Sequence, residues 1–229
     1  MPRMTRRGWL AVAGSASVVA GSAGGLLAGQ DPTNNSPRGF QHIPPRELIQ
    51  RRHLPNVELT TQDGKKVRFY DNLVKDKMVV INFMYARCEG ICPTMTANLV
   101  RVQKILHDRI GHDIFMYSIT LKPEEDTPQV LKEYADMHGA GPGWLFLTGK
   151  PTDVELLRRS LGFTNIDPDE DADKSSHIGM LRIGNEPMLR WSACPSQAHA
   201  QWIVTSILTE ADNPLKGGVK EDRAVAPGR

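Results

Sequence analysis

Cysteine is scarce in this 229-residue chain, which has three cysteines and only 6% aromatic residues. So few cysteines exclude a small disulfide-rich scaffold and indicate either chemistry or incidental burial. A strong compositional bias is also missing, because 40% of the residues are hydrophobic and 24% are charged. This balance excludes collagen-like, coiled-coil and wholly disordered proteins. It allows a core of roughly 150 residues that buries about two thirds of its chain surface.

An excess of charge of either sign is missing from most of the chain. The formal net charge is +2, but the first 29 residues contribute Arg3, Arg6 and Arg7 and no acidic residue, which leaves the rest at −1. A near-neutral body offers no electrostatic footprint for nucleic acid, so we expect no nucleic-acid partner.

The amino-terminal residues 1–29 have the layout of an export signal. A short basic start is followed from Gly8 by an uncharged run, rich in glycine, alanine and serine, that ends near Gly29. The pair Arg6-Arg7 directly before this run, together with its weak hydrophobicity, favours the twin-arginine route. The run is also long enough to remain as an uncleaved membrane anchor. Both interpretations predict a protein exported to the periplasm, where thiols can be oxidised.

The remaining sequence predicts one domain between two less structured segments. Residues 30–52 contain several prolines and are interpreted as a linker, with little helix or strand signal through Asn56. Residues 212–229 are interpreted as a disordered tail. Between them, residues 53–211 alternate strand and helix signals, which predicts an α/β layered sandwich.

Apolar runs and turn residues define the expected elements of this domain. The almost wholly apolar run Met78–Met84 predicts a central strand that is buried on both faces. Two hairpins are expected, one turning at Asp63-Gly64 and one at Gly184-Asn185. Thr127-Pro128 is typical of a helix start. The expected strands are 57–61, 66–69, 78–84, 114–119, 144–147, 177–183 and 188–191, and the expected helices are 93–109, 127–138, 153–161 and 198–211.

Two cysteines mark the sharpest local signal in the sequence. Cys88 and Cys92 directly follow the buried strand, and Pro93 is where the next helix is expected to begin. Functional sites in α/β proteins favour the carboxyl end of a strand, and a helix amino terminus favours thiolate over thiol. Cysteines at this spacing can also lie roughly 6 Å apart at Cα, near the range of a disulfide. Two buried structural cysteines are the alternative interpretation.

A metal site on this cysteine pair needs further ligands. A structural zinc site normally has four, and no second cysteine or histidine pair is visible in the sequence. Two thiolates and one imidazole suit copper instead, and Cu(I) in particular. Among the seven histidines, His177 opens an expected strand after a loop and could project toward a neighbouring loop. An ordinary loop histidine fits the same pattern.

Three further features are interpreted as structural or accessory. Residues Asp167–Asp173 alternate acids like a calcium loop, but Ala172 and Ile178 stand where such a loop needs glycine and glutamate. We therefore expect a solvated acidic loop that steers a cationic partner toward His177. Cys194 is expected to be buried and inert, with a third redox thiol or an extra metal ligand as alternatives. Core positions are expected for the methionines Met84, Met95, Met116 and Met180.

Three segments of the sequence resemble the Sco/SenC family. Residues Phe83–Pro93 are similar to the CxxxCP segment of these proteins, and Ser118–Leu121 is similar to their second strand. Asp126-Thr127-Pro128 is similar to the start of the helix that follows, and His177 lies where the family places its single histidine ligand. The resemblance covers about residues 53–210.

The resemblance implies a fold, a metal site and a role. The fold would be a thioredoxin-like three-layer sandwich with an added β-hairpin. Copper would be bound by Cys88, Cys92 and His177, and we expect the two cysteines to form a reversible disulfide. The protein would deliver copper to, or reduce cysteines of, the copper centre of cytochrome c oxidase, so its partner would be that oxidase subunit or another copper acceptor. Lys122 and Cys194 depart from the family pattern and suggest a divergent branch.

Two other functions use the same cysteine pair. One is a thiol–disulfide oxidoreductase and the other is a redox sensor without a metal. Thioredoxin-type oxidoreductases have two residues between their cysteines and a cis-proline facing them, whereas this chain has three residues and Ser176-His177 at the corresponding strand start. These differences favour metal binding over dithiol exchange, so an enzymatic activity is not the preferred interpretation.

Overall fold

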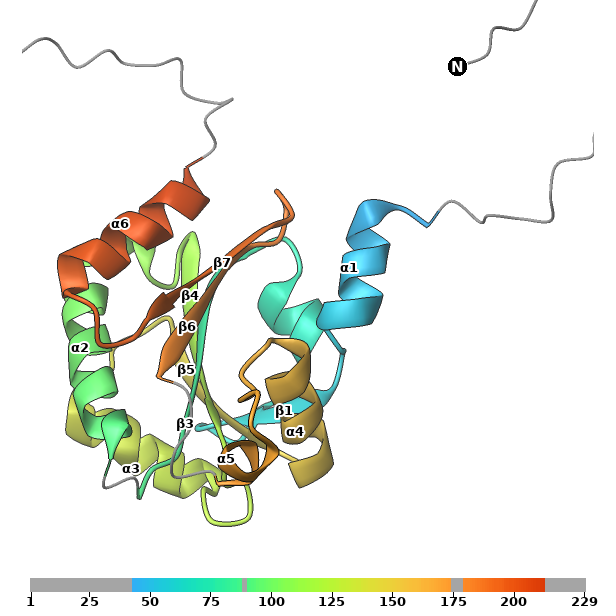
Figure 1. The fold of residues 1–229 in the computed structure, drawn as a ribbon. Coiled ribbons are helices and arrows are strands. Elements are labelled where there is room, and N and C mark those ends of the chain that lie inside the picture. Colours follow the sequence, from blue (N-terminus) through green and yellow to red (C-terminus); the bar gives the residue numbers. More distant parts are fainter. Residues whose placement is uncertain (1–42, 88–89, 174–178, 213–229) are drawn as a thin grey trace, which may run out of the picture. The chain divides into compact units, whose positions relative to one another are not determined.

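A seven-stranded mixed β-sheet forms the centre of the protein (Figure 1). This computed structural model describes residues 43–87, 90–173 and 179–212. The predictions for the export signal, the carboxyl-terminal tail, Cys88 and His177 therefore lie outside the described residues. The strands are β1 (Glu58–Thr61), β2 (Lys66–Arg68), β3 (Met78–Met84), β4 (Ile114–Thr120), β5 (Trp144–Gly149), β6 (Met180–Asn185) and β7 (Arg190–Pro195), in the spatial order β2-β1-β5-β4-β3-β6-β7.

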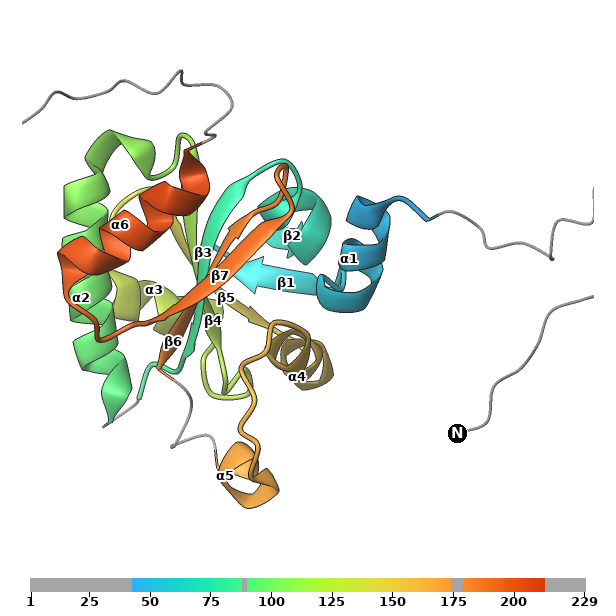
Figure 2. The same cartoon turned by 45° about the horizontal axis from the view of Figure 1, so that its top comes forward.

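Helices cover both faces of this sheet. Helices α2, α3 and α6 lie on one face, and α1 and α4 lie on the other (Figures 1 and 2). None of the helices in the described ranges is long and apolar enough to cross a membrane. The helical segments are α1 (Pro45–His53), η1 (a π-helical turn, Phe69–Val74), α2 (Ile91–Leu106), η2 (a 3₁₀ turn, His107–Arg109), α3 (Pro128–His138), α4 (Pro151–Ser160), α5 (Pro168–Ala172) and α6 (Ala200–Ala211).

Strand β3 is central and fully buried, as its apolar sequence predicts. Every residue of the strand is buried, and it pairs in parallel with β4 and antiparallel with β6. Its one amide, Asn82, donates to the Met95 sulfur and accepts from the Ser118 hydroxyl, which in turn accepts from the Trp144 indole N–H at 2.9 Å. These partners satisfy the polar groups of Asn82, which allows it to lie in an apolar core.

Local sequence signals also set the bounds of helix α3. The Thr127 hydroxyl accepts a hydrogen bond from the Val130 N–H, so the predicted cap is confirmed. Gly139 ends the helix in the left-handed conformation with φ of +72°, which glycine adopts without strain.

Helix α1 corrects the interpretation of residues 30–52 as a linker with little helix signal, for the part from Pro45 onward, while residues 30–42 lie outside the described residues. Arg46, in the first turn, donates two hydrogen bonds of 2.6 Å to the carboxylate of Glu186, which is 1% exposed. Glu186 also accepts from the Tyr70 hydroxyl and the Asp76 N–H. Burial alone raises the pKa of Glu186, but these hydrogen bonds outweigh burial and hold the pKa below its usual value. A partner 140 residues away leaves no local pattern, which is why the sequence does not reveal it.

The turn of the second hairpin is also displaced from its predicted position. Gly184 and Asn185 belong to strand β6, and the turn lies at residues 186–189. Gly184 pairs with Trp191, and a Cβ at Gly184 would lie only 2.2 Å from the indole ring. Glycine is therefore needed here for a close approach of the ring to the backbone and not for a turn.

Candidate metal centre

Cys92 lies in the first turn of helix α2, and it is fully buried. The helix begins at Ile91, two residues before the predicted start at Pro93. The first N–H groups of a helix have no acceptor within the helix, so a proline in the first turn loses no hydrogen bond. Cys92 is consequently part of the helix and does not precede it in extended conformation.

The start of helix α2 has an electrostatic character that favours a thiolate. The residue preceding the helix is Gly90, which has no side chain to cap it, and no acidic residue lies in the first turn. The positive end of the helix dipole is therefore not neutralised by a nearby side chain of its own helix. A thiolate, or a metal–thiolate group, is stabilised at such a position.

The chain that follows His177 in the sequence packs against the start of α2. A Cβ at Gly179 would lie 2.2 Å from Cδ1 of Ile91, the residue before Cys92. The Gly179 carbonyl also accepts a hydrogen bond of 3.0 Å from the Ser196 N–H, which fixes this strand end beside β7. The structure thus brings the segment that follows His177 into contact with the residue next to Cys92. The positions of Cys88 and His177 themselves stay predictions.

A buried carboxylate supports the loop that carries the cysteines. Asp126 is 2% exposed, and it accepts hydrogen bonds from the Ala86 N–H at 3.0 Å and from the Thr120 hydroxyl. Ala86 lies two residues before Cys88, whereas Asp126 directly precedes the cap of helix α3. Asp126 therefore joins the connection after β3 to the connection after β4. In the sequence, Asp126 is recognisable only as part of the Asp126-Thr127-Pro128 segment, which carries no signal of this role.

Replacing Asp126 with alanine is expected to destabilise the protein by about 1–3 kcal/mol, because the buried Thr120 hydroxyl and the half-buried Ala86 N–H lose their acceptor. Asp126→Asn should lose less, since both bonds are accepted by the same carboxylate oxygen and an amide oxygen in its place can still accept them, without the charge. Urea unfolding measures both, with Glu124→Ala as the control because Glu124 is exposed on the same loop. Equal stabilities for Asp126→Ala and the control would show that the carboxylate does not support the loop.

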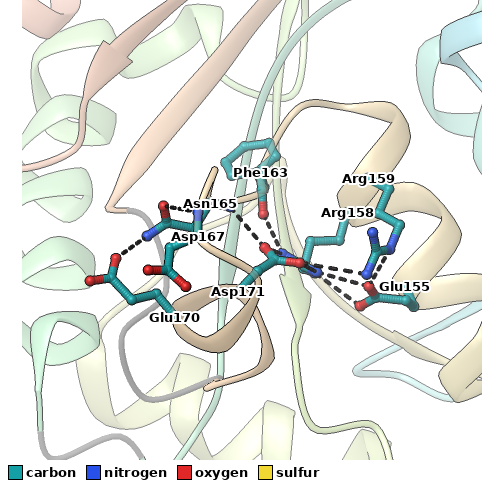
Figure 3. Close-up of polar contacts among 8 residues, drawn as sticks. All are labelled: Glu155, Arg158, Arg159, Phe163, Asn165, Asp167, Glu170 and Asp171. Atoms are coloured by element: carbon teal, nitrogen blue, oxygen red, sulfur yellow. Dashed lines mark hydrogen bonds and ion pairs between the residues drawn. The ribbon is translucent and has the colours of Figure 1, made fainter.

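The acidic segment that precedes His177 is not the wholly solvated loop predicted from its sequence. Residues Pro168–Ala172 form the short helix α5, and Asp171 forms a bidentate salt bridge with Arg158 (Figure 3). Both contacts are 2.6 Å, and the two side chains are only 9% and 5% exposed. Hydrogen bonds from Arg158 and from the Asn165 N–H hold the pKa of Asp171 well below its usual range.

For the remaining acids of this segment, the attraction of a cationic partner stays a prediction. Asp167, Asp169, Glu170 and Asp173 are exposed, so they can attract a cation. Asp167 also accepts from the Asp169 N–H and caps helix α5. The segment is thus one buried anchor with exposed acids around it.

Cys194 is buried in strand β7, as predicted. It is 3% exposed and lies opposite Leu181 of β6. Burial raises the pKa of its thiol to about 11, which keeps it protonated and unreactive at neutral pH. The core positions of Met84, Met95 and Met116 are confirmed, and Met180 is half-buried against the same core.

Fold and site together define a class of protein. A β3-α2-β4 unit followed by the β6–β7 hairpin and helix α6 is typical of thioredoxin-like proteins, with a cysteine in the first turn of the helix after β3 and the β1–β2 hairpin added to this core. The SCO1/SenC family model matches residues 49–187, and the chain belongs to this family. The predicted thioredoxin-like fold with an added hairpin is confirmed.

Relatives and solved structures agree with this assignment. A Stutzerimonas stutzeri protein whose name proposes copper binding is 31% identical over 62% of this chain and 70% of its own length. A structure of Bradyrhizobium japonicum ScoI with copper bound is similar, with 23% identity and a TM-score of 0.54 over 67% of this chain and 96% of the other. The structure of BsSco, described as having a disulfide switch and as a Sco-family cytochrome c oxidase assembly protein, matches with 24% identity and a TM-score of 0.55 over 68% and 91%. Two other relatives, from Bacillus subtilis and Rickettsia typhi, are matched over less than half of their own length.

Proposed function

We propose that this protein binds one copper ion through the sulfurs of Cys88 and Cys92 and a ring nitrogen of His177, and passes the ion to an acceptor during assembly of cytochrome c oxidase. The observation that carries the proposal is the position of Cys92, buried at the uncapped start of α2 with the chain after His177 packed against that same start. The family and the copper-containing relative support the choice of metal.

The chemistry of the proposed donors agrees with this cargo. Two thiolates are soft ligands that favour Cu(I), and an imidazole also tolerates Cu(II). Three protein ligands leave one side of the ion open, which suits transfer to a partner better than storage. We infer from the layout of residues 1–29 that the transfer takes place in the periplasm.

Copper binding and oxidation of the cysteine pair exclude each other in this proposal. A disulfide between Cys88 and Cys92 removes two of the three donors, since only thiolates bind the metal. Only the reduced protein can therefore pass copper to the partner. The oxidised form would be a resting state, or the product of reducing a cysteine pair in the acceptor.

Protein purified from the periplasm without added metal tests the function directly. Elemental analysis is expected to give about one copper per chain in the reduced protein, and alkylation followed by mass spectrometry should show a Cys88–Cys92 bridge in the metal-free fraction. Fully reduced protein that contains no copper, and acquires none from Cu(I), would overturn the proposal and favour dithiol exchange.

A further inference from the structure

A cavity of about 350 Å³ lies between helix α1, the end of helix α4 and the strands β6 and β7. Its walls are mostly apolar and include Ile49, Leu54, Leu161 and Trp191. The volume is within the range of small-molecule sites. None of its lining residues belongs to the candidate metal centre, so the cavity is a separate feature.

One wall of the cavity carries a charge with no counter-ion among the described residues. Arg182 of β6 is half-buried, and its Nε and Nη2 both donate to the Leu161 carbonyl, at 3.0 and 2.7 Å. Within the described residues, no carboxylate lies in ion-pair distance of Arg182, whereas the half-buried or buried Arg46 and Arg158 are paired with Glu186 and Asp171. Burial lowers the pKa of the Arg182 guanidinium from its usual value, because the charge is desolvated without a compensating anion.

Backbone geometry makes room for this guanidinium. Gly162 has φ of +77°, and a Cβ there would lie 2.7 Å from Nη2 of Arg182. The carbonyl of Leu161 ends helix α4 and offsets part of the charge. A guanidinium has five N–H groups, and the bonds to Leu161 use only two of them.

The indole of Trp191 contributes to the apolar part of the wall, and its ring edge packs on Gly184. The guanidinium of Arg182 can only donate hydrogen bonds. A ligand that pairs with it must therefore accept hydrogen bonds and carry a negative charge, and it must present an apolar body to the rest of the wall.

We propose that this cavity binds a small amphiphilic carboxylate, with its carboxylate on Arg182 and an unbranched alkyl chain against Ile49, Leu54 and Leu161. A planar carboxylate can accept two parallel hydrogen bonds from a guanidinium, and its negative charge complements that of Arg182. The proposal does not depend on copper, because the cavity and the candidate metal centre share no residue.

Octanoate is the probe, and 1-octanol is its uncharged counterpart. Calorimetric titration of the full-length exported protein, freed of bound lipid, is expected to show one saturable site for octanoate with at least roughly tenfold higher affinity than for 1-octanol. Arg182→Met should abolish this preference. Arg52→Met should keep it, because Arg52 is exposed on helix α1 and does not line the cavity.

The comparison of the two ligands on the unaltered protein needs no variant, so it holds even if Arg182→Met proves unstable. Equal affinities for octanoate and 1-octanol, or no saturable binding below the micelle concentration of octanoate, would overturn the proposal and leave Arg182 as a cap of helix α4. Copper content measured in parallel distinguishes this failure from a failure of the proposed function.

Discussion

Replacing Cys92 with alanine is expected to abolish tight Cu(I) binding and to leave the fold intact. The variant removes one of the two proposed sulfur donors. Loss of an outer-shell partner of a metal ligand typically costs about 10- to 100-fold in affinity, so loss of a direct ligand should cost at least roughly a hundredfold. The helix should persist because alanine is a good helix former and fills most of the volume of cysteine. Competition against a Cu(I) chelator under reducing conditions measures the affinity.

Cys194→Ala is the matched control, since it makes the same change at another buried cysteine. Its thiol, with a pKa raised to about 11, lies in β7 and should not contribute to copper binding. Cys88→Ala should match Cys92→Ala, and His177→Ala should weaken binding to a smaller extent. Equal affinity in Cys92→Ala and the unaltered protein, or a large loss in Cys194→Ala, would refute the proposed ligand set.

Elements that depend on local signals could be predicted from the sequence. Strand β3 is an apolar run, so its burial on both faces follows from its composition alone. Helix α3 has its cap, its early proline and its terminal glycine within a dozen residues. The junction at which Cys92 lies could be located in the same way, because an apolar strand and a helix start flank it.

Features that depend on distant partners could not be predicted in this way. Helix α1 is held by Glu186, and the hairpin after β6 does not turn at Gly184 because this glycine serves the packing of Trp191. Asp126 looks like part of a helix start, and its bond to Ala86 exists only once β3 and β4 lie side by side. In each case the residue type is ambiguous until the fold supplies its partner.

The candidate metal centre also combines features with local sequence signals and features that depend on distant partners. The chemistry of a cysteine pair at a strand–helix junction is visible in the sequence, whereas the support around it is tertiary. The contact of Gly179 with Ile91 requires β6 to lie beside β3. Nothing in the sequence around Gly179 or around Ile91 indicates that these two segments meet. Sequence therefore indicates what the site can bind, and the fold determines which segments converge on it.

Replacing Asp171 with asparagine is expected to destabilise the protein by about 3 kcal/mol at pH 7. The buried Arg158 guanidinium would lose its closest carboxylate, and an unpaired buried charge is strongly unfavourable. The value lies at the lower end of the usual range because Glu155 also contacts Arg158, at 2.8 Å. Urea unfolding gives the loss, and Asp169→Asn on the same helix serves as the control, since Asp169 is exposed.

The same ion pair predicts how this loss depends on pH. The pKa of Asp171 is lower in the folded protein than in an unfolded chain, where an aspartate titrates near about 3.9. The stabilisation by Asp171 is therefore complete above that value, and it is lost progressively as the pH falls below it and the carboxylate is protonated. The difference in unfolding free energy between the unaltered protein and Asp171→Asn should be smaller at pH 3 than at pH 7. A difference that stays constant or widens on acidification would mean that the charge of Asp171 is not what holds helix α5 to helix α4.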